Sequence, residues 1–218
     1  MTTHLRRGLT LRDAFREFLH HPTPWLLGAA TAIAVVARIV VADWQWTDAL
    51  VPVIMVASFP FTEWLIHVCI LHWRPRTFAG VTVDPLLARK HREHHVDPRN
   101  VPLIFIPWPV LVWLIPLLTA VAVFAFPRLG LGLTFVVAIT VIGCIYEWTH
   151  YLIHSDYQPK MRAYKAIRRN HRLHHFKNEH YWFGVTTSNT ADRVLHTAPD
   201  PESVAKSPTA KNLHALND

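Results

Sequence analysis

Some features are scarce or missing in this sequence, and their absence narrows the fold. Only two cysteines occur among 218 residues, Cys69 and Cys144, and both stand inside apolar runs, so a disulfide framework is not expected. No internal repeat is visible by sequence identity, although both halves follow the order of apolar hairpin, then histidines. The segment before Pro22 lacks the apolar core that a secretory signal peptide requires, so we expect no such leader.

The composition that remains is apolar and basic. Hydrophobic residues make up 51% of the chain, which is more than soluble domains usually carry. Lysine and arginine exceed aspartate and glutamate by 22 − 15 = +7. Such a surplus is typical of a nucleic-acid surface or of a membrane protein with basic loops. The basic residues here flank apolar spans and histidine clusters, so we expect a membrane and no nucleic-acid partner.

Four apolar stretches dominate the chain, and each is close to the roughly 20 helical residues that cross a bilayer. They cover residues 25–42, 49–73, 101–126 and 129–154. Pro102, Pro107, Pro109 and Pro116 predict that the third is bent or partly re-entrant. We therefore expect an all-α integral membrane fold with four transmembrane helices and a histidine-rich helical cap, although two tight hairpins would satisfy the charge pattern equally well.

The distribution of positive charge predicts the orientation. Segments 74–100 and 155–177 are rich in arginine and lysine, whereas the loops between the spans of each hairpin carry little positive charge. By the positive-inside rule, both termini and the histidines lie on the cytoplasmic side. We expect a basic interfacial helix within 1–24, a membrane-embedded metal domain over 25–196, and a loose tail over 197–218.

Histidines recur in four clusters at the ends of these spans. On a helix, positions i, i+3 and i+4 share a face, so each HxxHH offers its imidazoles to one side. Ten such ligands are too many for one ion and suggest two metals with about five each. His67 and His72 are five apart, so they act from a distorted helix end or serve different centres. The ten candidates are His67, His72, His91, His94, His95, His150, His154, His171, His174 and His175.

The order HxxxxH, HxxHH, HxxxH, HxxHH resembles that of the fatty acid hydroxylase/sterol desaturase superfamily of membrane di-iron oxygenases. Within it, NHRLHHFKNEHYWFGVTTSNTADRVLHT at 170–197 resembles the C-terminal signature of fatty acid 2-hydroxylases. The resemblance implies that all ten histidines bind two iron ions, with zinc a possible occupant after purification. It also implies hydroxylation of a fatty acid or lipid acyl chain by O₂, at C2.

The resemblance also sets expectations for partners. No HPGG haem motif is present, so electrons come from an external cytochrome b5-like or ferredoxin-like protein. The substrate is a lipid or acyl chain reached from the membrane. Glu63, Glu93, Glu147 and Asp192 are candidates for orienting the metal-bound rings, and His180 for a substrate or orienting role. We expect Tyr181, Trp182 and Phe183 to rest at the membrane interface.

Other readings remain open at this point. Relatives with a similar histidine count desaturate sterols or other lipids, or hydroxylate carotenoids. A membrane metal transporter or a haem protein is the non-enzymatic alternative, although transporters place polar ligands near the bilayer midplane. Histidines outside the four clusters are interpreted as ordinary surface or core residues; among them are His4, His20, His21 and His214.

Overall fold

The computed structural model describes residues 9–216, which are mainly helical. A short antiparallel hairpin, β1 (Arg76–Phe78) with β2 (Val81–Val83), pairs Thr77 with Thr82. A π-helical turn, His67–Leu71, continues α3, and 3₁₀ turns cover Trp46–Ala49, Pro201–Ser203 and Leu213–Ala215. The α-helices are α1 (Leu11–Phe18), α2 (Pro22–Val41), α3 (Leu50–Ile66), α4 (Leu86–Val96), α5 (Val101–Ile104), α6 (Trp108–Ala125), α7 (Leu129–His154), α8 (Arg162–Phe176) and α9 (Thr190–Val194).

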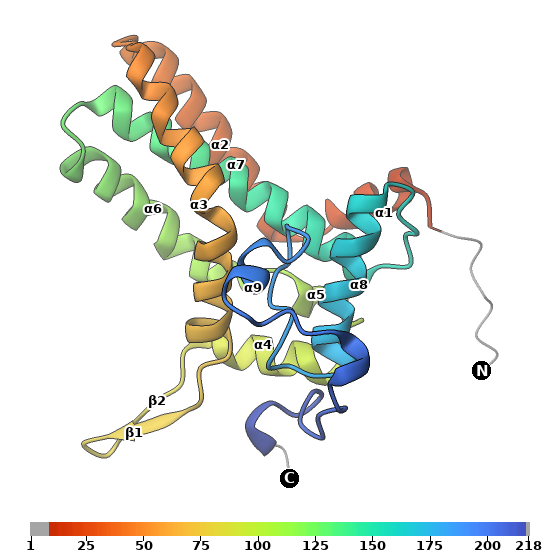
Figure 1. Cartoon of the computed structure of the whole chain (residues 1–218). Coiled ribbons are helices and arrows are strands. Elements are labelled where there is room, and N and C mark those ends of the chain that lie inside the picture. The colour runs from red at the N-terminus through yellow and green to blue at the C-terminus, as the bar shows by residue number, and fades with distance from the viewer. Residues whose placement is uncertain (1–8, 217–218) are drawn as a thin grey trace.

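Four helical segments are long and apolar enough to cross a membrane, as the sequence predicts. They span Pro22–Val41, Trp46–Leu71, Val101–Ala125 and Leu129–His154. Helices α2, α3, α6 and α7 extend together to one side of the molecule, whereas α4, α8 and α9 gather at the other end (Figure 1). Most apolar side chains on the four spans point outward, where lipid rather than protein would surround them.

Helix α7 is the centre of the bundle and packs against α2, α3 and α6. Its approach to α6 depends on Gly132, because a Cβ there would lie 2.0 Å from the carbonyl oxygen of Ala122. Small residues allow membrane helices to pack at short range in this way. The lower end of α7, which carries two of the clustered histidines, is thereby fixed relative to the other spans.

The end of the bundle away from the histidines is closed by buried ion pairs. Arg38, 3% exposed, donates to Asp48 at 2.8 Å and to Asp43 at 3.2 Å, and Arg128 also pairs with Asp48. A buried guanidinium needs such partners, since an unpaired charge is costly away from water. The network ties α2 to the loop before α3 and to the start of α7.

The predicted bend in the third span is confirmed as a break between α5 and α6 at residues 105–107. Pro107 has no N–H group and forces the preceding Ile106 out of helical conformation. The N–H of Ile106 donates to Glu147 on α7 at 2.9 Å, and its carbonyl accepts from the Thr23 hydroxyl at 3.0 Å. The break is therefore held by polar groups of two other helices.

The segment expected to form an interfacial helix contains the helix α1, whose apolar side chains are only partly turned outward. Phe18 is buried and packs against Phe105 and Tyr151, while Leu11 and Phe15 are about half exposed. Phe18 therefore joins the core instead of a bilayer-facing stripe. Residues 1–8 of the expected segment, His4 among them, lie outside the described residues.

The C-terminal segment is packed, although its composition predicted a loose tail over 197–218. Ala210 and Leu213 are 2% and 1% exposed. Two hydroxyl groups in this segment bind the buried carboxylate of Glu179. Hydrogen bonds to a buried anion stabilise a segment that has too few apolar residues to fold by burial alone.

Candidate metal centre

The ten clustered histidines form two groups of five at the end of the bundle. Within each group, one ring nitrogen per residue lies within 4.8 Å of all the others. The first histidine group contains His67, His72, His91, His95 and His174, and the second contains His94, His150, His154, His171 and His175. The structure thus brings together all ten residues that the sequence analysis selected, and divides them five and five.

The division follows helical periodicity. Helix α4 gives its i, i+4 pair, His91 and His95, to the first group and its middle histidine to the second. Helix α8 does the reverse, giving His171 and His175 to the second group and His174 to the first. Each HxxHH therefore serves both groups, because i+3 and i+4 point to slightly different sides of the helix.

The remaining first-group histidines depend on the π-helical turn at the end of α3. The N–H of His72 donates to the carbonyl of His67 at 3.0 Å, a bond that spans five residues instead of four. Residues i and i+5 then lie on one face, and such turns are frequent at functional sites. Of the two arrangements left open for His67 and His72, the structure has the distorted helix end.

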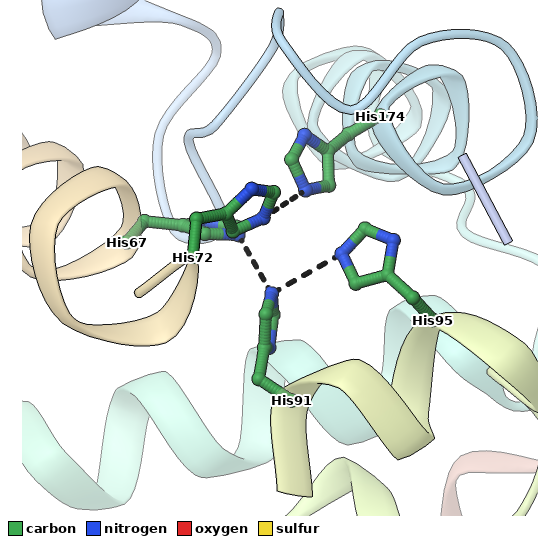
Figure 2. Close-up of side chains that lie close together, drawn as sticks. All are labelled: His67, His72, His91, His95 and His174. Atoms are coloured by element: carbon green, nitrogen blue, oxygen red, sulfur yellow. Dashed lines mark hydrogen bonds between the residues drawn. The ribbon is translucent and has the colours of Figure 1, made fainter. Parts of the chain in front are cut away.

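Ring nitrogens within each group face one another at distances suited to a shared cation. In the first group, the Nε2 of His91 lies 3.1 Å from that of His67 and 3.2 Å from that of His95 (Figure 2). In the second, the Nε2 atoms of His171 and His175 are 3.0 Å apart. Two imidazoles bound at right angles to one ion would be separated by about 3.0 Å, given metal–nitrogen bonds of about 2.1 Å.

The protonation state of the rings also suits the binding of a cation. Burial lowers the pKa of His95 to about 3, against the smaller raising effect of its bond to the Ala210 carbonyl. Burial also holds the pKa of His94, His171 and His175 well below the ordinary value. These four rings are therefore neutral near pH 7, which is the form that binds metal.

The first group is oriented from outside by backbone carbonyls. The Nδ1 atoms of His67, His95 and His174 donate to the carbonyls of Phe183 (2.7 Å), Ala210 (2.9 Å) and Tyr181 (2.8 Å). Because Nδ1 carries the proton in each ring, Nε2 presents a lone pair to the other rings. Several lone pairs that converge without a proton repel one another, so this group suits a cation.

The second group has far fewer partners on its outer side. The Nδ1 atoms of His94, His171 and His175 are buried, and none has a hydrogen-bond partner among the described residues. These rings are held by edge contacts with one another, such as His154 against His175 at 4.7 Å between centroids. All five come from α4, α7 and α8, so three regular helices place them.

Two of the predicted carboxylates anchor the loop that supports the first group. Asp192 accepts from the N–H groups of Phe183 and Gly184, both at 2.9 Å, and Glu63 accepts from the N–H of Thr186 at 3.0 Å. The Phe183 carbonyl in turn accepts from His67. These carboxylates therefore help to position the ring of His67 indirectly, because they hold the loop that contains the Phe183 carbonyl. Burial raises the pKa of Asp192, while its hydrogen bonds act in the opposite direction.

The other predicted supporting residues lie elsewhere. Glu147 accepts from Ile106 and stabilises the break between α5 and α6. Glu93 is exposed and pairs with Lys90 at 2.7 Å, as expected for the solvent side of a helix whose other face carries histidines. His180 has a 69% exposed side chain and lies 3.5 Å from Glu179. Glu93 and His180 thus point away from both histidine groups.

Several residues near the site were not selected by sequence reasoning. Trp182 and Phe183 were expected at the membrane interface but are 1% and 6% exposed, and Phe183 contacts the rings of His67 and His174. Ala210 and His214 act on the first group from the end of the chain. The run YWFGV could have indicated burial, whereas no sequence signal marks a backbone carbonyl as a partner.

The chain is similar in sequence to known proteins. The sequence matches the protein-family profile described as fatty acid hydroxylase over residues 52–197. It is 27% identical to the dihydroceramide fatty acyl 2-hydroxylase FAH2 of Arabidopsis thaliana over 157 residues, and 26% identical to FAH1 of the same plant over 168 residues. These alignments cover 69% and 72% of this chain, and the chain spans 61% and 65% of the relatives' lengths.

The fold also has a counterpart among solved structures. The structure of full-length Scs7p, in which only the hydroxylase domain is visible, matches 92% of this chain and 70% of its own with a TM-score of 0.63 at 17% identity. Because the family match covers more than half of the residues, the chain belongs to the fatty acid hydroxylase family.

Proposed function

We propose that this protein is a membrane-bound hydroxylase that inserts one oxygen atom from O₂ at C2 of a lipid acyl chain. The observation that carries the proposal is the pair of five-histidine groups at one end of four apolar helices. Membership of the fatty acid hydroxylase family supports the reaction, and the two acyl 2-hydroxylases among its relatives support the carbon attacked.

We propose two iron ions as the resident metals, one in each histidine group. The ten Nε2 or Nδ1 donors would hold them, since imidazole suits iron as well as zinc and copper. When bound, the iron pair supplies O₂ activation and the insertion of oxygen into an unactivated C–H bond. The residues of the chain keep the rings neutral, hold them in position and exclude water from the site.

An acyl carbon needs space beside both histidine groups. A narrow cavity of about 30 Å³ touches His91 of the first group and His150 of the second, and its walls include Leu71, Leu103 and Tyr146. This volume matches one water molecule in the liquid, so it accepts one or two carbon atoms of a chain and not a polar head group. The cavity is large enough for the acyl carbon that the proposed reaction brings to both metals.

Electrons would enter from an external donor protein, cytochrome b5-like or ferredoxin-like, on the cytoplasmic side. Helix α8 carries a basic hollow of about 620 Å³, and Lys165, Arg169 and Phe176 in its lining lie on the side of the helix turned away from the histidines. Arg168 bonds only Gln158, and Arg172 stacks on Phe176; neither forms an ion pair within residues 9–216. An acidic donor seated there would lie about one helix diameter from the metals, about 10 Å.

Charge reversal on this basic face tests the electron route. We expect Lys165→Glu combined with Arg169→Glu to raise the apparent KM for an acidic donor protein several-fold and to weaken its salt dependence. Activity with a small chemical reductant stays unchanged, since that route needs no docking. Arg193→Glu, an exposed change outside α8, is the control. Equal KM values for the two variants would exclude this face as the docking site.

Lipid mass spectrometry of a host that expresses the chain tests the reaction. The intact protein and a His180→Ala control should yield acyl lipids that gain one oxygen, with fragmentation locating it at C2, whereas His94→Ala should not. Loss of two hydrogens would identify a desaturase of a sterol or other lipid, and an oxygenated carotenoid would identify a carotenoid hydroxylase. No change in lipids, with iron and a donor supplied, would favour metal transport or haem binding.

A further inference from the structure

The family match ends at residue 197, yet the chain continues across the metal centre. Residues 200–216, which we call the C-terminal strap, run from Asp200 past Leu213 and pack beside the first histidine group. Ala210 and Leu213 are almost completely buried. A segment beyond the residues that the family profile matches thus contributes to the surroundings of the histidines.

The strap is seated on a buried carboxylate. Glu179, 2% exposed, lies in the loop just after α8. Its Oε1 accepts a hydrogen bond from the Ser207 hydroxyl at 2.9 Å and another from the Thr209 hydroxyl. The N–H of Ser207 also donates to the Lys177 carbonyl at 2.7 Å. These bonds fix residues 207–209 relative to the helix that carries the last HxxHH.

From this seat the strap reaches two histidines of the first group. The Ala210 carbonyl, one residue beyond Thr209, accepts from Nδ1 of His95 at 2.9 Å. The Nε2–H of His214 donates to the backbone carbonyl of His72 at 3.0 Å. The other contacts of the strap lie with the end of α8 and the loop after it, where Lys211 stands over the ring of Phe176 and Ser207 binds Glu179.

We infer that the C-terminal strap is a working part of the first metal site alone, and that Glu179 is the positioning residue that seats it. The Ala210 carbonyl keeps the proton of His95 on Nδ1, so that Nε2 offers its lone pair to the ion. This inference rests on the proposed function, which supplies the metals. A partner of this kind changes metal affinity by about 10-fold to 100-fold when it is lost.

A purely structural role would have a different consequence. If the strap only stabilised the fold, its loss would weaken both metal sites together, since α4 and α8 serve both. A positioning role predicts loss at the first site while the second keeps its affinity. The two sites can be separated because one histidine substitution in each group leaves the other group complete.

The experiment measures metal binding to the purified full chain, with affinity from titration and content from elemental mass spectrometry. In a His175→Ala background, which keeps the first group intact, Glu179→Ala should lower the affinity for the ion by about 10-fold to 100-fold. In a His95→Ala background, which keeps the second group intact, Glu179→Ala should leave the affinity unchanged. Circular dichroism checks that each variant stays folded.

Conservative variants sharpen the assignment. Glu179→Gln retains an acceptor oxygen for Ser207 and Thr209 and should restore most of the affinity. Ser207→Ala combined with Thr209→Val should reproduce the effect of Glu179→Ala, whereas Lys206→Ala, an exposed change on the strap, should have none. Equal losses in both backgrounds, or no loss in either, would overturn the inference while two ions remain bound to the unaltered chain. An unaltered chain that binds no ion overturns the proposed function itself.

Discussion

The two histidine groups contain the same number of rings but are held in place by different means. In the first group, three of the five rings donate to backbone carbonyls supplied by loops after α8. In the second, three outer nitrogens are buried and have no hydrogen-bond partner among the described residues, and the rings come from the regular helices α4, α7 and α8. Two members of the first group, His67 and His72, come from a π-helical turn. Regular α-helical geometry does not determine the positions of these two rings. The group that contains irregular backbone is therefore also the group whose rings donate hydrogen bonds to backbone carbonyls.

Substitution of two neighbouring histidines on α8 should have the largest effect on activity. His174 belongs to the first group and His175 to the second. We expect His174→Ala and His175→Ala each to lower hydroxylation more than about 100-fold, because a lost ligand costs more than a lost outer partner. Each variant should retain one bound ion, measured by elemental analysis of the purified protein. His180→Ala is the matched control, and two ions bound to either variant would contradict the division.

Sequence reasoning recovers the spans and the ten histidines because both depend on local patterns. Apolar length marks the spans, and i, i+3, i+4 spacing marks the clusters. The assignment of rings to groups is not local, since it depends on how α4 crosses α8. Helix α4 gives two histidines to the first group and α8 gives two to the second, and only the packing of the two helices determines this distribution.

The supporting contacts were harder to foresee for a related reason. The acceptors for His67, His95 and His174 are backbone carbonyls, which every residue possesses. The tail looked loose because its composition is polar and small, and its anchor is one distant carboxylate, Glu179. Conversely, Glu93 was selected for lying within HREHH, although the helix turns it to the opposite side.

Removal of the Asp192 carboxylate should lower the metal affinity of the first group only. Asp192→Ala leaves the buried N–H groups of Phe183 and Gly184 without an acceptor, which costs about 1–3 kcal/mol for each group. The Phe183 carbonyl is then free to move away from His67, so the first ion should bind about 10-fold more weakly. Metal titration in the His175→Ala background measures this loss.

The Asp192→Asn variant retains one acceptor oxygen and should recover part of the affinity. Circular dichroism melts report the accompanying loss of stability in both variants. The opposite result would be that Asp192→Ala lowers the affinity for the second ion as strongly as that for the first. The loop would then support both histidine groups, which would contradict the proposed difference between them.

Chelation compares the two sites directly. The His174→Ala chain retains only the second group and the His175→Ala chain only the first. We expect the His174→Ala chain to lose its ion several-fold faster to a chelator, because outer hydrogen bonds fix ring orientation and raise ligand basicity. The release is followed with a colorimetric chelator under one set of conditions. Equal rates would mean that regular helices hold rings as firmly as backbone acceptors do.

The smallest expected effect concerns His214, whose ring binds the backbone carbonyl of His72. Its backbone has a φ of 66°, which asparagine tolerates better than alanine, so His214→Asn removes the ring with little added strain. We expect the first ion to bind two-fold to three-fold more weakly, about 0.5 kcal/mol, because one backbone contact at the π-helical turn is lost while His95 keeps its acceptor. Titration beside Lys206→Ala measures the change. A loss as large as that of Glu179→Ala would show that the turn at His72, and not the ring of His95, is what the strap controls.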